Sequence, residues 1–318
     1  MKIGIVGATG LIGRTFLSVL EKSTFPVDLV YLSATEHSEG KDQIFQNKHY
    51  KIVNTTKQVL QKECDLVVLA SDSEVSSRWS PIIQDFATWT LDISSAHRDD
   101  LSIPLVVPEI NGSVLENYYG IISNPNCSTI QLTKAVVPIQ KLFGLKKVVV
   151  STYQSISGMG QKGLASFHAE KNLPVTDSPL SKNCTPYIGP IEDNGYCQEE
   201  IKMIHEARRI LSDHELPIYP TTVRVPIEIT HGESVYIETS KEIEMDSLLN
   251  GIQQAPFLTY DETAIRTIDA INTNQVHIGR LRQIDSHTLH FWCIADNLLV
   301  GSAWNAYQIV KDLERRLV

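Results

Sequence analysis

One cysteine in this sequence is placed to act as a nucleophile. Cys127 lies in the segment SNPNCST at 123–129, and an apolar stretch at 130–142 predicts a helix directly after it. The free N–H groups and the dipole at a helix N-terminus stabilise a thiolate, lower its pKa, and hold an oxyanion. A cysteine in an α/β protein is more often a small buried side chain, but this junction favours chemistry at Cys127. We expect the other four cysteines to be small buried side chains of this ordinary kind; they are Cys64, Cys184, Cys197 and Cys293.

A thiolate that accepts an acyl group needs an acid/base partner. The chain has ten histidines, and His231 is the one that ends the segment RVPIEITH at 224–231, where we expect a strand to finish. The residue pattern alone leaves the choice among the ten open.

Three glycines near the N-terminus form a second chemical signature. Gly7, Gly10 and Gly13 follow an apolar strand and open a helical pattern with the spacing G-x-x-G-x-x-G. Glycine lets the backbone approach a pyrophosphate, and the helix N-terminus offers N–H groups to it. The motif predicts a dinucleotide site; the alternative is a tight strand-to-helix turn without a ligand.

The region after the second predicted strand bears on which dinucleotide binds. NAD-specific loops usually place an acidic residue there to hold the ribose diol. Here the segment 32–38 reads LSATEHS, in which Thr35, His37 and Ser38 are candidates for a 2′-phosphate, whereas Glu36 would oppose one if it pointed inward. The pattern favours NADP.

The elements that must position these residues change character along the chain. Up to about residue 125, apolar strands alternate with amphipathic helices, predicting a Rossmann-type, doubly wound parallel sheet. The expected strands are 2–6, 27–32, 65–70 and 88–93, and the expected helices are 12–20 and 76–86.

The second half instead predicts an α+β domain with a mostly antiparallel sheet, because its strands alternate polar and apolar residues. The expected strands are 146–156, 221–229, 234–239, 276–282 and 289–295. We expect a helix at 198–211, a long loop at 172–194, and a final amphipathic helix at 302–317 that packs on the first domain.

Length and composition are consistent with this plan. A chain of 318 residues is long for one core, so two domains are expected. The net charge of −9, without a block of Lys or Arg, argues against nucleic acid or an anionic membrane as a partner. We expect no signal peptide and no membrane span. Five cysteines without metal-ligand spacing predict reduced thiols, a cytoplasmic location and no metal site.

With these residues in view, the chain resembles the aspartate-semialdehyde dehydrogenase family over nearly its whole length. The two most specific segments are NPNCST at 124–129 and STYQSISGMGQ at 151–161. The others are GATGLIG at 7–13, SAHR at 95–98, PLVVPEIN at 104–111, EEIKMIHEARRIL at 199–211, VRVPIEITHGESVYIET at 223–239 and ADNLLVGSAWNA at 295–306.

The resemblance implies a role for each residue of the predicted site. Cys127 would form the acyl-thioester, Gln154 would orient the substrate, and His231 would be the acid/base. Substrate binding is implied for Arg224 at the α-carboxylate, Glu206 at the α-ammonium, and Arg98, Asn126 and Arg209 around the phosphoryl group. Cofactor contacts are implied for Thr9, Gly10, Leu11, Ile12, Ser157, Gly158 and Asn297, beside the flanking Gly7 and Gly13.

Some of these residues also have plainer interpretations. Glu206 and Arg209 are three positions apart on a helix and could form a surface ion pair, and Arg98 could belong to a solvated loop. An inward-facing Arg224 would need a partner, which a substrate carboxylate would supply.

The chain departs from the family pattern at three places. The family usually has Lys where Arg209 stands, an Arg where His37 stands, and a Gly pair where this chain has Asp72 and Ser73.

The resemblance implies reduction of an acyl phosphate with NADPH, in aspartate-family amino-acid biosynthesis. It implies a homodimer or a dimer of dimers, with 1–127 and about 298–318 in the cofactor domain and 128–297 in the catalytic domain. The alternatives are a related acyl-phosphate reductase, such as one for N-acetylglutamyl phosphate, and a non-catalytic nucleotide-binding paralogue. Glu206 argues against an N-acetylated substrate, and the four residues Cys127, Gln154, Arg224 and His231 argue against a silent paralogue.

Overall fold

The chain forms two compact units. The structure is a computed structural model that describes residues 1–263 and 265–316. Unit 1 comprises Met1–Pro125 and Ser302–Val318, and unit 2 comprises Asn126–Gly301. We expected the first domain to end at residue 127, whereas this division falls after Pro125 and assigns Cys127 to unit 2. Each unit is described by itself.

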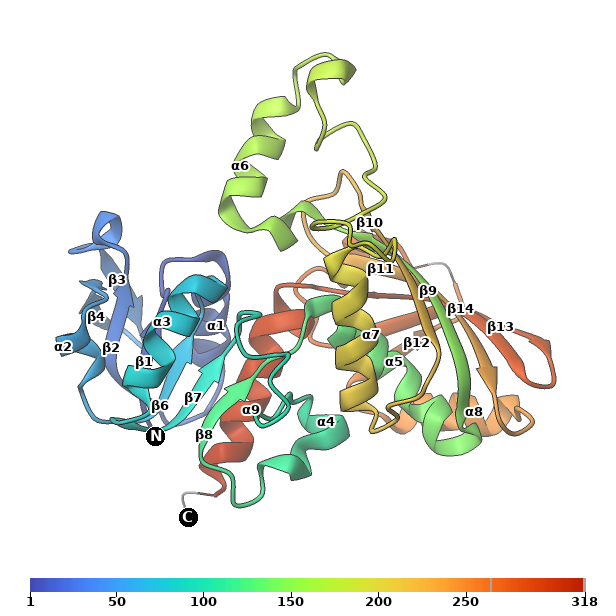
Figure 1. The fold of residues 1–318 in the computed structure, drawn as a ribbon, viewed down its shortest axis with the longest axis horizontal. Coiled ribbons are helices and arrows are strands. Elements are labelled where there is room, and N and C mark those ends of the chain that lie inside the picture. The colour runs from blue at the N-terminus through green and yellow to red at the C-terminus, as the bar shows by residue number, and fades with distance from the viewer. Residues whose placement is uncertain (264, 317–318) are drawn as a thin grey trace. The chain divides into compact units, whose positions relative to one another are not determined.

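Unit 1 is built on a parallel sheet of six strands. Its spatial order is β5-β2-β1-β6-β7-β8, and every neighbouring pair is parallel. The strands are β1 (Lys2–Val6), β2 (Asp28–Ala34), β5 (Val53–Asn54), β6 (Cys64–Leu69), β7 (Ala87–Asp92) and β8 (Gly120–Ser123). This order, with β1 at the centre, confirms the predicted doubly wound sheet. Most residues of the longer strands are buried, because helices and loops cover the sheet (Figure 1).

The helices of unit 1 include the C-terminal one. They are α1 (Leu11–Lys22), α2 (Lys57–Leu60), α3 (Ser73–Ile83), α4 (Pro108–Asn111) and α9 (Trp304–Glu314), with short 3₁₀ turns at Glu36–Ser38 and Gly112–Leu115. Helix α9 contacts α1 and α4. The predicted helix at 302–317 starts later, because Leu299–Ala303 forms a π-helical turn, and position 317 lies outside the described residues. The hairpin β3 (Asp42–Phe45) and β4 (Lys48–Lys51) was not predicted.

Unit 2 is built on a second six-stranded sheet in the order β10-β9-β11-β14-β13-β12. The strands are β9 (Leu145–Gln154), β10 (Ile218–Arg224), β11 (His231–Thr239), β12 (Leu258–Asp261), β13 (Val276–Asp285) and β14 (Thr288–Ala295). The three central pairs are antiparallel and the two outer pairs are parallel, which confirms a mostly antiparallel sheet.

Helices cover one face of the unit 2 sheet. The covering helices are α5 (Cys127–Phe143), α7 (Gln198–Ile210) and α8 (Met245–Gln254). The unit also contains α6 (Gly160–Glu170) and 3₁₀ turns at Ile156–Met159, Val175–Asp177 and Thr267–Ala270. The nearly fully buried α5 contacts β11 and β14 as well as α7 and α8. Helix α6 and the predicted loop after it extend away from the sheet (Figure 1). The opposite sheet face exposes Val149, Tyr153 and Tyr219 by 37%, 38% and 48%.

The largest error in a predicted strand boundary lies just before His231. We expected a strand over 221–229 and placed His231 at its end, but β10 ends at Arg224 and His231 is the first residue of β11. Pro226 lacks the N–H that a ladder needs, and Thr230 has a φ of 79°, so the chain turns between the two strands. Within the described residues, no helix has both the length and the apolar character to cross a bilayer.

Candidate active site

The N-terminus of α5 presents the predicted nucleophile. Asn126 is the N-cap, and its Oδ1 accepts hydrogen bonds from the main-chain N–H groups of Ser128 at 2.9 Å and Thr129 at 3.2 Å. Cys127 is therefore the first helical residue, as its position in the sequence suggested. The positive end of the helix dipole and the cap geometry favour a thiolate at this sulfur.

Cys127 lies next to His231. The distance from Cys127 Sγ to His231 Nε2 is 3.3 Å, although the two residues are 104 positions apart. Cys127 also packs closely against Gly301, where a side chain would not fit, since a Cβ built there would lie 2.6 Å from Cys127 Cβ. The structure thus brings together, within unit 2, the two residues that we paired as nucleophile and acid/base.

His231 is fully buried and held at its second ring nitrogen. Its Nδ1 accepts the main-chain N–H of Ser155 at 3.0 Å, and the Ser155 hydroxyl lies 3.2 Å from the same atom. Burial, with the nearby Arg224 guanidinium, lowers the pKa of His231 to about 3, against a smaller opposing effect of the Thr230 backbone. The imidazole is therefore neutral at physiological pH.

Arg224 faces inward, which is the orientation for which we expected a partner. It is 8% exposed, and its Nη1 donates to the carbonyl of Ser155 at 2.5 Å. Burial lowers its pKa, while the negative charges of Glu199 and of the Cys127 thiolate act in the opposite direction. A buried guanidinium near the sulfur can hold a substrate carboxylate in a bidentate pair.

Glu206 is not a surface residue. It is 1% exposed on α7, and its Oε2 accepts the main-chain N–H of Asn126 at 2.6 Å. Glu199, two helical turns earlier, accepts the Asn126 side-chain amide at 2.9 Å. The interpretation of Glu206 as a surface residue is therefore wrong, and Arg209 on the same helix is half-buried. Glu199 was not predicted as a site residue, although its spacing of seven from Glu206 places both on one helix face.

The remaining predicted residues of unit 2 lie beside this group. Gln154 ends β9 opposite His231, is 1% exposed, and donates to Thr152 Oγ1 at 3.3 Å. A Cβ on Gly158 would lie 2.9 Å from Arg224 Nη1. Ser157 and Asn297 are buried and hydrogen-bonded to one another at 2.9 Å.

In unit 1, the glycine motif forms the expected strand-to-helix turn. Gly7 has a φ of 81°, and a Cβ there would lie 2.4 Å from the carbonyl oxygen of Ala70. A Cβ on Gly13 would lie 2.2 Å from the carbonyl oxygen of Gly7, and Gly10 is the N-cap of α1. Leu11 and Ile12 open α1 and are partly buried. These close approaches to the protein's own backbone require glycine in the turn, and the N–H groups at the helix N-terminus that the turn presents fit a pyrophosphate.

The candidates for a 2′-phosphate divide into two groups. Thr9 Oγ1 donates to Ser38 Oγ at 3.1 Å, and Lys41 Nζ lies 3.5 Å from the same oxygen. Thr35 and His37 are exposed, as is Glu36. Lys41 was missed because it follows the segment that we examined; it offers the cation that the family pattern places at position 37.

The presence of Asp72, where the family usually has the first residue of a Gly pair, has a local structural explanation. Asp72 is the N-cap of α3, and its carboxylate accepts the main-chain N–H of Val75 at 2.9 Å. The acidic side chain thus stabilises the helix that it opens.

Arg98 is held at the carboxyl ends of two strands, and the structure contradicts a freely solvated loop. Its Nε donates to the carbonyl of Asn124 at 2.9 Å and its Nη2 to that of Ile93 at 3.1 Å.

Among the four cysteines interpreted as buried side chains, Cys64, Cys197 and Cys293 are buried, but Cys184 is exposed.

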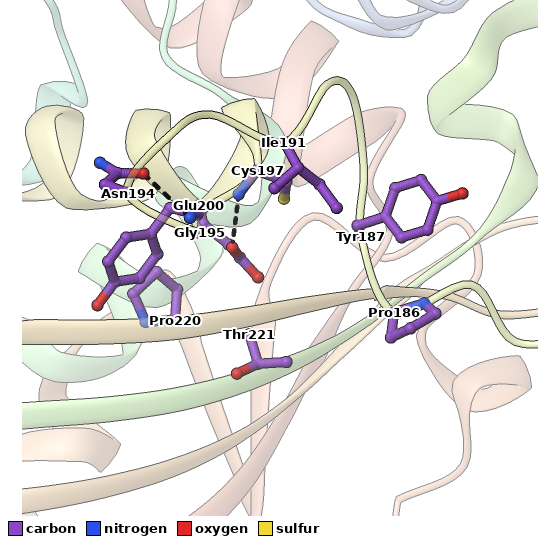
Figure 2. Close-up of a pocket in the computed structure, with 10 residues that line it drawn as sticks. Pro186, Tyr187, Ile191, Asn194, Gly195, Cys197, Glu200, Pro220 and Thr221 are labelled. Carbon is purple, nitrogen blue, oxygen red and sulfur yellow. Dashed lines mark hydrogen bonds between the residues drawn. The ribbon is translucent and has the colours of Figure 1, made fainter.

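A surface pocket lies elsewhere in unit 2, beside the edge strand β10 (Figure 2). Its lining includes Tyr187, Ile191, Pro220 and Thr221, and the carboxylate of Glu200 accepts the main-chain N–H of Cys197 at 2.8 Å. The described residues that line it include none of the predicted site residues.

Comparison with known proteins assigns both halves of the chain. A family model for the NAD binding domain of semialdehyde dehydrogenases matches residues 2–118, and one for their dimerisation domain matches residues 136–300. Aspartate-semialdehyde dehydrogenase from Aquifex aeolicus is 37% identical over 98% of this chain and 97% of its own length. Aspartate-semialdehyde dehydrogenase 2 from Vibrio cholerae is 35% identical over 98% and 97%. A crystal structure of aspartate semialdehyde dehydrogenase II from Vibrio cholerae complexed with ASA matches with a TM-score of 0.91 at 34% identity, covering 99% of this chain and 98% of that one.

Proposed function

The chain belongs to the aspartate-semialdehyde dehydrogenase family, and we propose that it reduces L-aspartyl 4-phosphate to L-aspartate 4-semialdehyde with NADPH through a thioester on Cys127. The observation that carries this proposal is the 3.3 Å contact between Cys127 Sγ and His231 Nε2 at the N-terminus of α5. A thiolate is a strong nucleophile near neutral pH, and a thioester is a good hydride acceptor. The reaction serves aspartate-family amino-acid biosynthesis.

The covalent step uses residues of unit 2. The Cys127 thiolate attacks the β-acyl carbon, the C–S bond forms, and the bond to the phosphoryl oxygen breaks with its electron pair leaving on phosphate. His231 supports the sulfur as its acid/base partner, and Gln154, which ends β9 opposite His231, orients the acyl group. A bound NADPH would supply the hydride that reduces the thioester, after which the C–S bond breaks, its electron pair returns to the Cys127 sulfur and the aldehyde is released.

The substrate's amino-acid end would be read by two charged side chains. We assign Arg224 to the α-carboxylate, since its buried guanidinium matches that planar anion. We assign Glu206 to the α-ammonium, and an N-acetylated substrate would leave this buried carboxylate without its cation. For the phosphoryl group we retain Arg98 and Arg209 as cations and Asn126 as a hydrogen-bonding neighbour.

The cofactor proposal is NADP rather than NAD. In unit 1, the turn at Gly7, Gly10 and Gly13 fits the pyrophosphate. Thr9, Ser38 and Lys41 supply two hydroxyl groups and a cation that suit a 2′-phosphate, with Thr35 and His37 nearby in the chain. In unit 2, Ser157, Gly158 and Asn297 are retained as contacts of the nicotinamide end.

We further propose a homodimer that works in the cytoplasm. The match to a dimerisation domain supports the dimer, and the exposed aromatic and apolar side chains on the open face of the unit 2 sheet offer a surface for it. Static light scattering should give twice the 35.6 kDa chain mass, whereas a dimer of dimers would give four times that mass. Five free thiols suit a reducing compartment.

The experiment that tests the proposed activity follows NADPH formation at 340 nm, a wavelength at which only the reduced cofactor absorbs. Purified protein receives L-aspartate 4-semialdehyde, NADP and phosphate, with NAD in a parallel reaction. The proposal expects a sustained rise in absorbance only when phosphate is present, and a faster rise with NADP than with NAD. Folded protein that is inactive with both cofactors would reject the proposed substrate.

A further inference from the structure

Ser155 connects two residues of the candidate site through its main chain. It follows β9 directly and is fully buried. Its N–H donates to His231 Nδ1 at 3.0 Å, and its carbonyl accepts from Arg224 Nη1 at 2.5 Å. One residue thus holds both the imidazole and the guanidinium, and none of the roles assigned above includes it.

The contact with Nδ1 determines where His231 carries its proton. A main-chain N–H can only donate, so Nδ1 must present its lone pair to Ser155. A neutral imidazole has one N–H, which then has to be on Nε2, the atom that lies 3.3 Å from Cys127 Sγ. A proton on Nδ1, as in an imidazolium, would point at the N–H of Ser155.

We infer that Ser155 is a positioning residue that fixes His231 as the Nε2–H tautomer, so that His231 donates a hydrogen bond to the Cys127 thiolate. This inference rests on the proposed function for the identity of the nucleophile, and it narrows the role of His231 to that of a donor. The low pKa of His231 agrees with a ring that stays neutral.

A buried network extends the arrangement beyond Ser155. The N–H of Thr230 donates to Asn297 Oδ1 at 2.9 Å, which fixes the orientation of that amide, and Asn297 Nδ2 donates to Ser157 Oγ at 2.9 Å. The hydroxyls of Ser157 and Ser155 are 3.0 Å apart, and that of Ser155 is 3.2 Å from His231 Nδ1. Both hydroxyls also lie 3.1 Å from Asn297 Oδ1, which is an alternative acceptor for each of them. Donation from Ser157 to Ser155 and from Ser155 to His231 Nδ1 is the arrangement that agrees with an unprotonated Nδ1.

The chemical consequence concerns the first bond-forming step. With a thiolate on Cys127 and a proton already on Nε2, no proton passes from sulfur to imidazole before attack. The sulfur lone pair forms the C–S bond and the carbonyl π electrons move to oxygen. They return when phosphate departs, while the Nε2–H group remains a fixed donor that favours the negatively charged species.

Nuclear magnetic resonance of the ligand-free chain tests the tautomer directly. Histidine is labelled with ¹⁵N, and long-range ¹H–¹⁵N spectra are recorded from about pH 6 to pH 9, a range that spans the ordinary histidine pKa. His231 signals are assigned by their loss in His231→Gln. We expect a protonated Nε2, an unprotonated Nδ1 and no titration. A protonated Nδ1, or a ring that titrates in this range, would overturn the inference.

A pair of serine variants tests the positioning role. Ser155→Ala removes one of two donors to Nδ1, so we expect the His231 signals to shift and kcat to fall about 3- to 10-fold, with KM for the semialdehyde within about 2-fold. The control, Ser178→Ala, removes a fully buried hydroxyl that donates to the Pro174 carbonyl at 2.7 Å and should change neither reading. Unchanged His231 signals and kcat in Ser155→Ala would contradict a role for its hydroxyl.

The spectra need no substrate, so the two proposals can fail separately. The expected tautomer in a chain without phosphate-dependent activity would reject the proposed function alone. Full activity with a proton on Nδ1 would reject the positioning of His231 alone.

Discussion

The main-chain N–H of Asn126 donates to Oε2 of Glu206 at 2.6 Å, although the two residues are 80 positions apart. The contact attaches the N-cap of α5 to α7, and it brings a buried carboxylate to the start of the helix that carries Cys127. Glu206 therefore makes a structural contact and is also the residue for which we propose the binding of the substrate ammonium.

Glu206→Gln separates these two roles, because the amide oxygen can still accept the Asn126 N–H but carries no charge. We expect KM for L-aspartate 4-semialdehyde to rise about 10- to 100-fold, since hydrogen bonds to charged groups contribute roughly 1.5–3 kcal/mol. Steady-state kinetics measures the change, with the exposed Glu215→Gln as the control. An unchanged KM would leave Glu206 with the structural role only.

Lys41 is expected to determine the preference for NADP. Replacing it by Gln removes the cation 3.5 Å from Ser38 Oγ, and we expect kcat/KM with NADPH to fall about 10-fold while that with NADH stays nearly constant. Lys48→Gln in the neighbouring hairpin is the matched control, since Lys48 is also exposed. An equal loss with both cofactors would contradict a contact with the 2′-phosphate.

Glu233 makes stability depend on pH. It is fully buried on β11, with the Cys293 thiol 3.6 Å from its Oε2, and burial raises its pKa well above 4.5. Between about pH 4.5 and the raised pKa, the folded chain retains a proton that the unfolded chain releases. The free energy of unfolding therefore falls as pH rises through this window. The total fall is about 1.4 kcal/mol for each unit by which folding raises the pKa of Glu233.

Glu233→Gln mimics the protonated acid and should lose this dependence. Urea titrations are made at about pH 5, near the lower end of this window, and at about pH 8. The variant should gain stability relative to the wild type at the higher pH. The exposed Glu242→Gln should follow the wild type at both values. A constant difference between Glu233→Gln and the wild type at the two pH values would mean that Glu233 is ionised in the folded chain.

The sequence was most informative where a local pattern carries the structure. The glycines of 7–13 lie at the turn predicted for them, and Cys127 begins α5, because strand, turn and helix follow one another in the chain. The break between β10 and β11 was missed because VRVPIEIT continues an alternating pattern, whereas Pro226 and the left-handed Thr230 end the ladder.

Contacts between distant segments could not be predicted from such patterns. Ser155 meets His231 only because β9 pairs with β11 so that Gln154 lies opposite His231. Thr9 meets Ser38, 29 positions away, only because the loop after β2 returns to the start of α1. These partners depend on strand register and loop path, which neither hydrophobic periodicity nor a short motif encodes.

The most direct test of thioester chemistry on Cys127 omits phosphate. The protein is mixed with L-aspartate 4-semialdehyde and NADP, NADPH is followed at 340 nm, where the reduced cofactor absorbs, and the protein is then analysed by peptide mass spectrometry. The account predicts a burst of about one NADPH per site, an aspartyl adduct on Cys127, and steady turnover only when phosphate is added. Cys127→Ser should show neither burst nor adduct while still binding NADPH. Sustained turnover without phosphate, or activity retained in Cys127→Ser, would contradict the account.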